Sequence, residues 1–221
     1  MIWTVPNMLT ILRLLAAPGV VFAFVFLARP WADFVALLLF VSASVTDWLD
    51  GYLARKWNQT SRFGAMLDPI ADKAMVVIAL LAVTGLFGMS AWVMLPATVI
   101  LFREVFISGL REFLREQAGL LAVTKLAKWK TTVQMVAIAV LLAQGIFEHY
   151  VGMHSYGMDA AMVDDVLAGR QPDEMGLAWK YNGLLATMYG GIALLWLAAV
   201  LTFVTGWDYF AKSLPYLRGK P

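Results

Sequence analysis

The sequence predicts an all-α membrane protein with about six transmembrane helices, both termini in the cytoplasm and a polar site at the cytoplasmic ends of helices two and three. Hydrophobic residues make up 61% of the 221-residue chain, and its mean hydropathy is +0.73, whereas ordinary soluble domains are nearer half apolar. The chain also contains six apolar segments, each close to the length that crosses a bilayer. The length suits one domain that covers residues 1–221.

The six apolar segments run over about residues 9–27, 32–53, 63–88, 91–114, 131–151 and 184–204. The first follows Pro6 and Asn7, a pair typical of turns. The second and third are joined by a short polar turn at 57–61, which predicts an antiparallel hairpin of two helices. The fifth and sixth are separated by a long acidic loop at about 152–180.

Lysine and arginine are distributed unequally between the two sides of these segments. One side carries most of them: Arg55, Lys56, Arg62, Arg111, Arg115, Lys125, Lys128, Lys130, Lys212, Arg218 and Lys220. The other side carries Arg29, Arg170 and Lys180. Because cytoplasmic loops are enriched in basic residues, we expect both termini in the cytoplasm and the 152–180 loop outside.

Composition excludes several kinds of site. The chain has no cysteine, which excludes disulfides, thiolate metal sites and cysteine nucleophiles. With two histidines, a metal site would depend mainly on oxygen ligands. The net charge of +2 gives no indication of a nucleic-acid partner.

Four aspartates lie in the two helices of the predicted hairpin. Ionisable groups within apolar segments are candidates for function. Asp47 and Asp50 stand near the end of the second segment, and Asp68 and Asp72 near the start of the third. Spacings of three and four residues place each pair on one helical face. The hairpin then brings four carboxylates to one depth, near the cytoplasmic side.

These carboxylates repel one another in a medium of low dielectric constant and need positive charge nearby. Arg55 and Lys73 offset part of the charge. Divalent cations can neutralise the remaining negative charge, because Mg²⁺ prefers carboxylate, water and phosphate oxygens. Two such ions about 4 Å apart can stabilise the attacking and leaving oxygens of a phosphoryl displacement. Gly51, Ala54 and Gly64 leave room for a ligand to approach. The alternative, helix-end aspartates in interfacial water, explains one such residue better than four.

The run from Asp47 to Asp72 resembles the signature of the CDP-alcohol phosphotransferase family. Every motif position is matched, by Asp47, Asp50, Gly51, Ala54, Arg55, Gly64, Asp68 and Asp72. Members of this family are membrane enzymes that transfer a phosphatidyl group from CDP-diacylglycerol to an alcohol and release CMP. The resemblance implies that the four aspartates bind two Mg²⁺ or Mn²⁺ ions and that Asp72 is the general base. It also implies a nucleotide-binding pocket formed by the remaining motif residues with Asp47, Asp50 and Asp68.

Stretches at 6–13, 103–112 and 126–131 resemble the member of the family whose acceptor is sn-glycerol 3-phosphate. Such a dianion needs cationic groups, and the candidates for binding its phosphate are Arg103, Arg111, Lys125 and Lys128. Asn7, Thr10 and Arg13 are candidate substrate contacts. The resemblance further implies a homodimer in a bacterial inner membrane, with the active site facing the cytoplasm.

Several alternatives stay open at this point. Within the family, the acceptor could instead be that of cardiolipin, phosphatidylinositol phosphate or phosphatidylserine synthesis. A cation transporter that uses intramembrane carboxylates is the alternative from another class. Arg111, Lys125 and Lys130 could be basic residues of cytoplasmic loops, and Arg103 could form a structural ion pair with Glu104.

Overall fold

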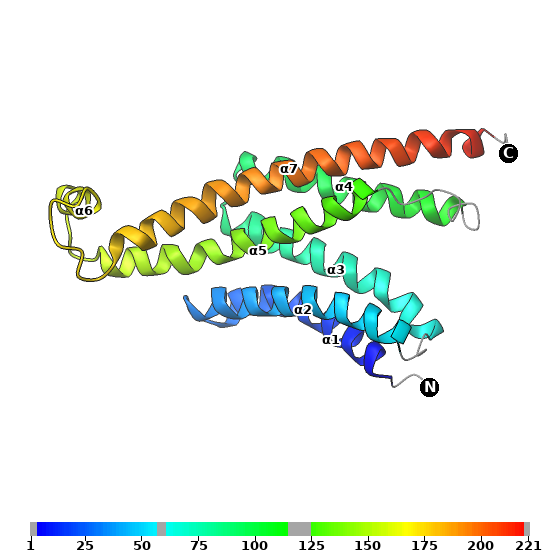
Figure 1. The fold of residues 1–221 in the computed structure, drawn as a ribbon, viewed down its shortest axis with the longest axis horizontal. Coiled ribbons are helices and arrows are strands. Elements are labelled where there is room, and N and C mark those ends of the chain that lie inside the picture. Colours follow the sequence, from blue (N-terminus) through cyan, green and yellow to red (C-terminus); the bar gives the residue numbers. More distant parts are fainter. Residues whose placement is uncertain (1–3, 57–60, 115–124, 219–221) are drawn as a thin grey trace. The chain divides into compact units, whose positions relative to one another are not determined.

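All secondary structure in the described residues is helical. The structure, a computed structural model, describes residues 4–56, 61–114 and 125–218, without the side chains of 48–55, 125, 127 and 128. Its helices are α1 (Val5–Phe26), α2 (Trp31–Lys56), α3 (Arg62–Leu86), α4 (Ala91–Leu114), α5 (Lys125–His154), α6 (Ala160–Leu167) and α7 (Leu177–Leu217) (Figure 1). The all-α class predicted from the sequence is confirmed.

The first helix begins earlier than the sequence predicts. Thr4 is the N-cap of α1, and its side chain accepts a hydrogen bond from the backbone nitrogen of Asn7 at 3.4 Å. Pro6 lies in the first turn, where its missing N–H would have no helical partner in any case. The interpretation of Pro6 and Asn7 as a turn before the helix was therefore wrong.

The last helix is also longer than the apolar segment that predicts it. Asp173 accepts hydrogen bonds from the backbone nitrogens of Leu177, at 2.6 Å, and Ala178, at 2.9 Å, so that α7 begins at Leu177 rather than near 184. The N–H groups of Ala178 and Leu177 lower the pKa of the Asp173 carboxyl, because they stabilise its charged form. The loop predicted at 152–180 is thus shortened from both sides, since α5 extends to His154.

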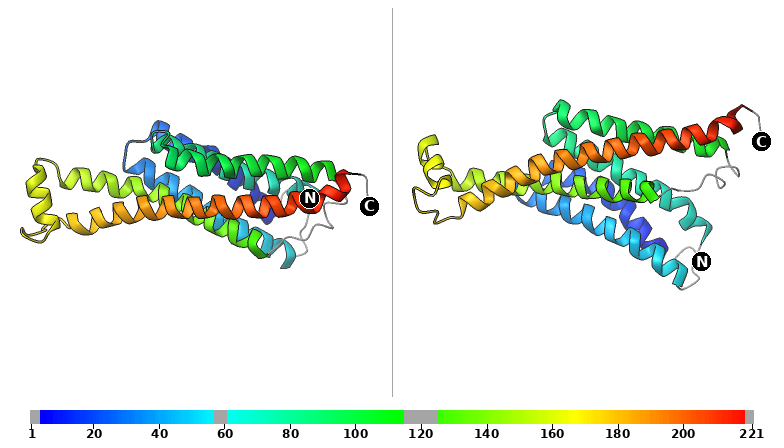
Figure 2. Two further views of the ribbon diagram at one scale, coloured as in Figure 1. Left: turned by 90° about the horizontal axis from the view of Figure 1, so that it is seen from above. Right: turned by 45° about the horizontal axis from the view of Figure 1, so that its top comes forward.

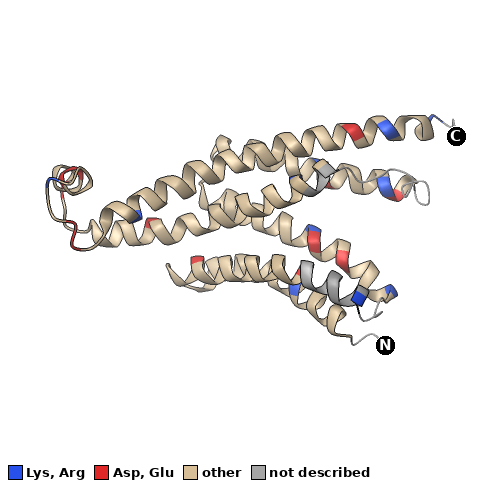
Figure 3. Ribbon diagram, in the orientation of Figure 1, with Lys and Arg blue, Asp and Glu red and all other residues tan. Residues whose placement is uncertain are grey.

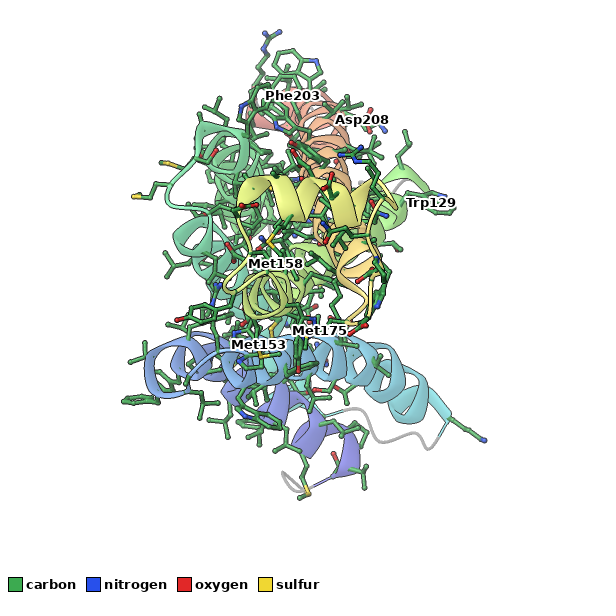
Figure 4. The ribbon with its side chains drawn as sticks, turned by 90° about the vertical axis from the view of Figure 1, so that its left-hand side faces the viewer. Trp129, Met153, Met158, Met175, Phe203 and Asp208 are labelled. Carbon is green, nitrogen blue, oxygen red and sulfur yellow. The ribbon has the colours of Figure 1, made fainter. Side chains whose placement is uncertain are left out.

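The loop that remains contains the short helix α6, which Asp159 caps by accepting a hydrogen bond from Met162 at 2.8 Å. Figure 4 looks onto this end of the chain and labels Met158 and Met175, in the connections on either side of α6. The polar loop therefore has secondary structure that its acidic composition did not indicate.

Within the described residues, five helices are long and apolar enough to cross a membrane: α1, α3, α4, residues 129–154 of α5, and α7. Charged residues are sparse along them, and α7 has a long uncharged stretch between those near its two ends (Figure 3). The sixth predicted span is α2, with 26 residues. The count of six spans and the orientation of the termini stay predictions.

The chain divides into two compact units. Unit 1 comprises residues 1–82 and 138–191, and unit 2 comprises 83–137 and 192–221. In unit 1, α1 and α2 lie side by side (Figures 1 and 2). Small residues bring them together: Ala17, Ala36 and Ala43 are buried, and a side chain at Gly19 would lie 3.1 Å from Leu39.

In unit 2, α4 packs against the last part of α7 through aromatic side chains. The ring centroids of Phe106 and Phe210 are 5.6 Å apart, and those of Trp92 and Trp196 are 6.4 Å apart. The indole nitrogen of Trp196 also donates a hydrogen bond to the backbone oxygen of Trp92 at 3.0 Å. Aromatic pairs of this kind stabilise packing beyond the area that they bury.

Candidate active site

A polar stripe on α1 forms one side of the site in unit 1. Asn7, Thr10 and Arg13 are spaced three residues apart, which places them on one face of the helix. Their exposed fractions are only 3%, 1% and 3%, although the rest of the helix is mainly apolar. Buried polar groups need hydrogen-bond partners, and these side chains find theirs on α2, on α3 and at Ser61, the residue before α3.

Arg13 joins the two aspartates that begin and end the motif. Its Nη1 donates hydrogen bonds to Oδ1 of Asp47 on α2 and to Oδ1 of Asp72 on α3. The arginine side chain is 2% exposed, whereas those of Asp47 and Asp72 are 51% and 52% exposed. One buried cation thus holds two half-exposed carboxylates, which remain accessible to a ligand.

Thr10 orients the third described aspartate. Its hydroxyl donates a hydrogen bond to Oδ1 of Asp68 at 2.8 Å. Thr10 is buried and Asp68 is exposed, so the hydrogen bond orients one oxygen of the carboxylate while the side chain stays accessible to solvent. Thr10 and Arg13 therefore contact the aspartates directly, whereas the sequence predicts them only as substrate contacts.

Asn7 contacts the start of α3. The Ser61 hydroxyl donates to Oδ1 of Asn7 at 3.0 Å and accepts from the backbone nitrogen of Gly64 at 2.9 Å. A side chain at Gly64 would place its Cβ 2.6 Å from the same Asn7 oxygen. Gly64 thus packs closely against Asn7, which is a structural reason for a glycine at a position predicted to be in the nucleotide pocket.

The structure brings together only part of the predicted metal-binding set. Asp50 lies on α2, but its side chain is outside the described part of the chain, as are those of Gly51, Ala54 and Arg55. Among the described residues, no group of three acidic or histidine side chains could hold a metal ion. Arg13 contacts Asp47 and Asp72 and was not among the counter-charges predicted from the sequence, whereas Arg55 and Lys73 stay predictions for that role.

A second polar cluster lies in unit 2. Oε1 of Glu104 on α4 accepts hydrogen bonds from Nη1 of Arg103, at 3.2 Å, and from Nζ of Lys130 on α5. The guanidinium of Arg111 lies over the Tyr209 ring, 5.1 Å from its centroid. The ion pair of Arg103 with Glu104, which the sequence left open as an alternative, is present, and the role of Arg103 in phosphate binding stays a prediction.

Lys130 is not a loop residue. It lies inside α5 and is 5% exposed, so its interpretation as a cytoplasmic loop charge was wrong. Sequence reasoning missed its contact with Glu104 because the two residues are 26 positions apart. Lys125 and Lys128 lie on the same helix, with side chains outside the described part.

An apolar pocket of about 450 Å³ lies beside this cluster, between α4 and α7. Its lining consists of Thr98, Val99, Phe102, Arg103, Phe106, Phe203, Gly206, Trp207 and Phe210. The volume falls in the usual range of ligand pockets. Arg103 is the charged residue of this lining, and a side chain at Gly206 would lie 2.9 Å from its Cγ.

Comparison with known proteins agrees with the motif. The model of the CDP-alcohol phosphatidyltransferase family matches residues 3–164. A protein of Cereibacter sphaeroides named CDP-diacylglycerol–glycerol-3-phosphate 3-phosphatidyltransferase is 57% identical over 216 residues, which cover 98% of each chain. Proteins of the same name from Shigella flexneri and Escherichia coli K12 are 45% and 44% identical over 163 residues, 72% of this chain and 88% of theirs.

The match covers both polar clusters. It contains the aspartate motif and α1 of unit 1, together with Arg103, Glu104 and Lys130 of unit 2. A transporter is therefore excluded as the class of this protein. The chain belongs to the CDP-alcohol phosphatidyltransferase family.

Proposed function

We propose that this protein transfers the phosphatidyl group of CDP-diacylglycerol to sn-glycerol 3-phosphate, giving phosphatidylglycerophosphate and CMP. The observation that carries the proposal is the 57% identity, over nearly the full length, to a relative whose name specifies this reaction. The complete aspartate motif at 47–72 supports the same chemistry.

We assign the motif aspartates to two Mg²⁺ or Mn²⁺ ions. Asp47, Asp50, Asp68 and Asp72 offer hard carboxylate oxygens, the ligands that such ions prefer. The half-exposed side chains of Asp47 and Asp72 fit this role, because a buried residue holds them while their oxygens stay accessible. When bound, the ions neutralise the diphosphate and the charge that develops on the leaving CMP.

The displacement itself needs one base. The Asp72 carboxylate accepts the proton of the acceptor hydroxyl as the hydroxyl oxygen bonds to the phosphatidyl phosphorus. The bond from that phosphorus to the CMP oxygen breaks, and CMP leaves with the electron pair. Arg13 orients Asp72 for this step through its hydrogen bond. No covalent enzyme intermediate is required.

The two substrates use different residues in this proposal. The nucleotide pocket comprises Gly51, Ala54, Arg55 and Gly64, with Asp47, Asp50 and Asp68. The phosphate of the acceptor is bound by Arg103, Arg111, Lys125 and Lys128. The charged residues around Glu104 in unit 2 support the second assignment, because their net charge is positive.

We further propose that the 221 residues act as one domain in a bacterial inner membrane, with six spans and both termini cytoplasmic. The basic residues beside the 57–61 turn, after the fourth segment and in the C-terminal tail support a cytoplasmic active site. A homodimer is the proposed assembly, by resemblance to the family.

The test is CMP release by the purified protein in detergent, with CDP-diacylglycerol and Mg²⁺. Glycerol 3-phosphate, inositol phosphate, serine and phosphatidylglycerol are supplied separately, with a chelator as control. We expect release with glycerol 3-phosphate and its loss with chelator. Release with a different acceptor alone would contradict the proposed specificity. No release with any acceptor, from folded protein, would contradict the proposed reaction.

A further inference from the structure

The cluster in unit 2 carries more positive than negative charge. Arg103, Arg111 and Lys130 are cationic, and Glu104 is the carboxylate that the described contacts place among them. Both arginines lie close enough to Lys130 to repel its charge. The cluster therefore has an excess of about two positive charges, and such an excess favours a doubly charged anion.

Glu104 is central to the geometry of this cluster. One of its oxygens accepts hydrogen bonds from both Lys130 and Arg103. The side chains of Glu104 and Lys130 are only 17% and 6% exposed, and a buried ammonium needs a partner of opposite charge. The carboxylate thus joins α4 to α5 and fixes the direction of two cations.

Helix α7 packs against the side chains of Arg103 and Arg111. Gly206 on α7 leaves space for the aliphatic part of Arg103, and the Tyr209 ring supports the guanidinium of Arg111. Nε of Arg103 is buried and makes no hydrogen bond within the described part of the chain. The cations are therefore ordered before a ligand binds, which lowers the entropy cost of binding.

We propose that Glu104 is a positioning residue that holds Lys130 and Arg103 in a preformed cationic cluster for the doubly charged phosphate of the acceptor. Lys130 thereby joins the phosphate-binding residues, beyond the four assigned above. The inference rests on the proposed function. It also gives a reason for acceptor choice: an alcohol without a phosphate dianion leaves the excess positive charge uncompensated.

The test measures KM separately for the two substrates in the Glu104→Gln variant, which removes the charge and keeps the size of the side chain. Hydrogen bonds to charged groups contribute roughly 1.5–3 kcal/mol, and 1.36 kcal/mol corresponds to a factor of ten. We expect KM for glycerol 3-phosphate to rise by about tenfold or more, while KM for CDP-diacylglycerol stays within about twofold of the wild-type value.

Asp208→Asn is the matched control. It removes one carboxylate from the same unit, but Asp208 pairs with Lys212 in an exposed i,i+4 contact at 2.7 Å. Such pairs contribute little, so both KM values should be those of the wild type. The double variant Glu104→Gln/Lys130→Gln removes the ion pair without leaving a buried lysine unpaired. It should fold, and its acceptor KM should remain raised.

Three results would overturn the inference. An unchanged acceptor KM in Glu104→Gln, an equal rise of both KM values, or a wild-type acceptor KM in the double variant would make Glu104 a structural residue only. If Glu104→Gln does not fold, Glu104→Asp replaces it, with the same comparison of KM values. The wild-type assay separates the two proposals, because absent turnover with glycerol 3-phosphate contradicts the function itself.

Discussion

Replacing Arg13 by methionine tests the central contact of unit 1. The change removes hydrogen bonds to Asp47 and Asp72 while keeping an unbranched side chain. Two hydrogen bonds to charged groups contribute at least about 3 kcal/mol. Because the carboxylates are 51% and 52% exposed, water screens and rehydrates them, and we halve the loss to about 1.5 kcal/mol.

The assay is thermal unfolding of the purified protein in detergent without added divalent ion. For a chain of this size, about 1.5 kcal/mol lowers Tm by roughly 3–6 °C. Arg170→Met is the control, because Arg170 is 61% exposed and pairs with one carboxylate, Asp165, at 2.7 Å. We expect its Tm to fall less, since exposed pairs contribute about 0.2–1 kcal/mol.

Arg13→Lys refines the same test. Lysine keeps the positive charge but lacks the planar guanidinium that binds two carboxylates at once, so its Tm should lie between those of wild type and Arg13→Met. The reasoning is refuted if Arg13→Met unfolds at the wild-type temperature, or if its Tm falls no further than that of Arg170→Met.

Three further predictions concern single residues. Asp72→Asn should abolish CMP release while CDP-diacylglycerol binding, followed by titration, stays close to wild type. Gly64→Ala should lower Tm and turnover, because its Cβ would lie 2.6 Å from Asn7 Oδ1. The carboxyl of Asp173 has a lowered pKa. Its charged form therefore stabilises the start of α7 fully at pH values above 3.8, the ordinary pKa of an aspartate. That stability should be lost as the pH falls through the lowered pKa, and Asp173→Asn should remove this pH dependence of Trp179 fluorescence.

Each of these predictions has a contradicting outcome. Near-normal turnover of Asp72→Asn would exclude it as the base. Wild-type stability of Gly64→Ala would mean that Asn7 moves aside at no cost, and Gly85→Ala, where nothing lies within 4 Å of the added Cβ, is the matched control. An identical pH profile in Asp173→Asn and wild type would show that the cap does not control the start of α7.

The sequence predicts those features of the fold and site that depend on local spacing. The all-α class follows from the apolar segments, and the faces of the aspartate pairs follow from steps of three and four residues. The i,i+3 series of Asn7, Thr10 and Arg13 is equally local, and its three polar side chains on an apolar helix already indicate a polar contact.

Long-range contacts could not be read from spacing. Arg13 contacts Asp47 and Asp72 across 34 and 59 residues, so that sequence reasoning did not pair it with them. The start of α7 was missed for another reason. Hydropathy marks the part of a helix that lipid covers, whereas the Asp173 cap determines where its hydrogen bonding begins.

The polar face of α1 has a practical consequence for handling this protein. The 26-residue run from Asp47 to Asp72 is sufficient to recognise the family, but it is not a self-contained site. The carboxylates of Asp47, Asp68 and Asp72 accept hydrogen bonds from side chains of α1, which lies outside this run. A fragment without α1 would therefore keep the whole motif but lose the buried hydrogen-bond partners of these carboxylates, and its inactivity would not show that the motif itself is inactive.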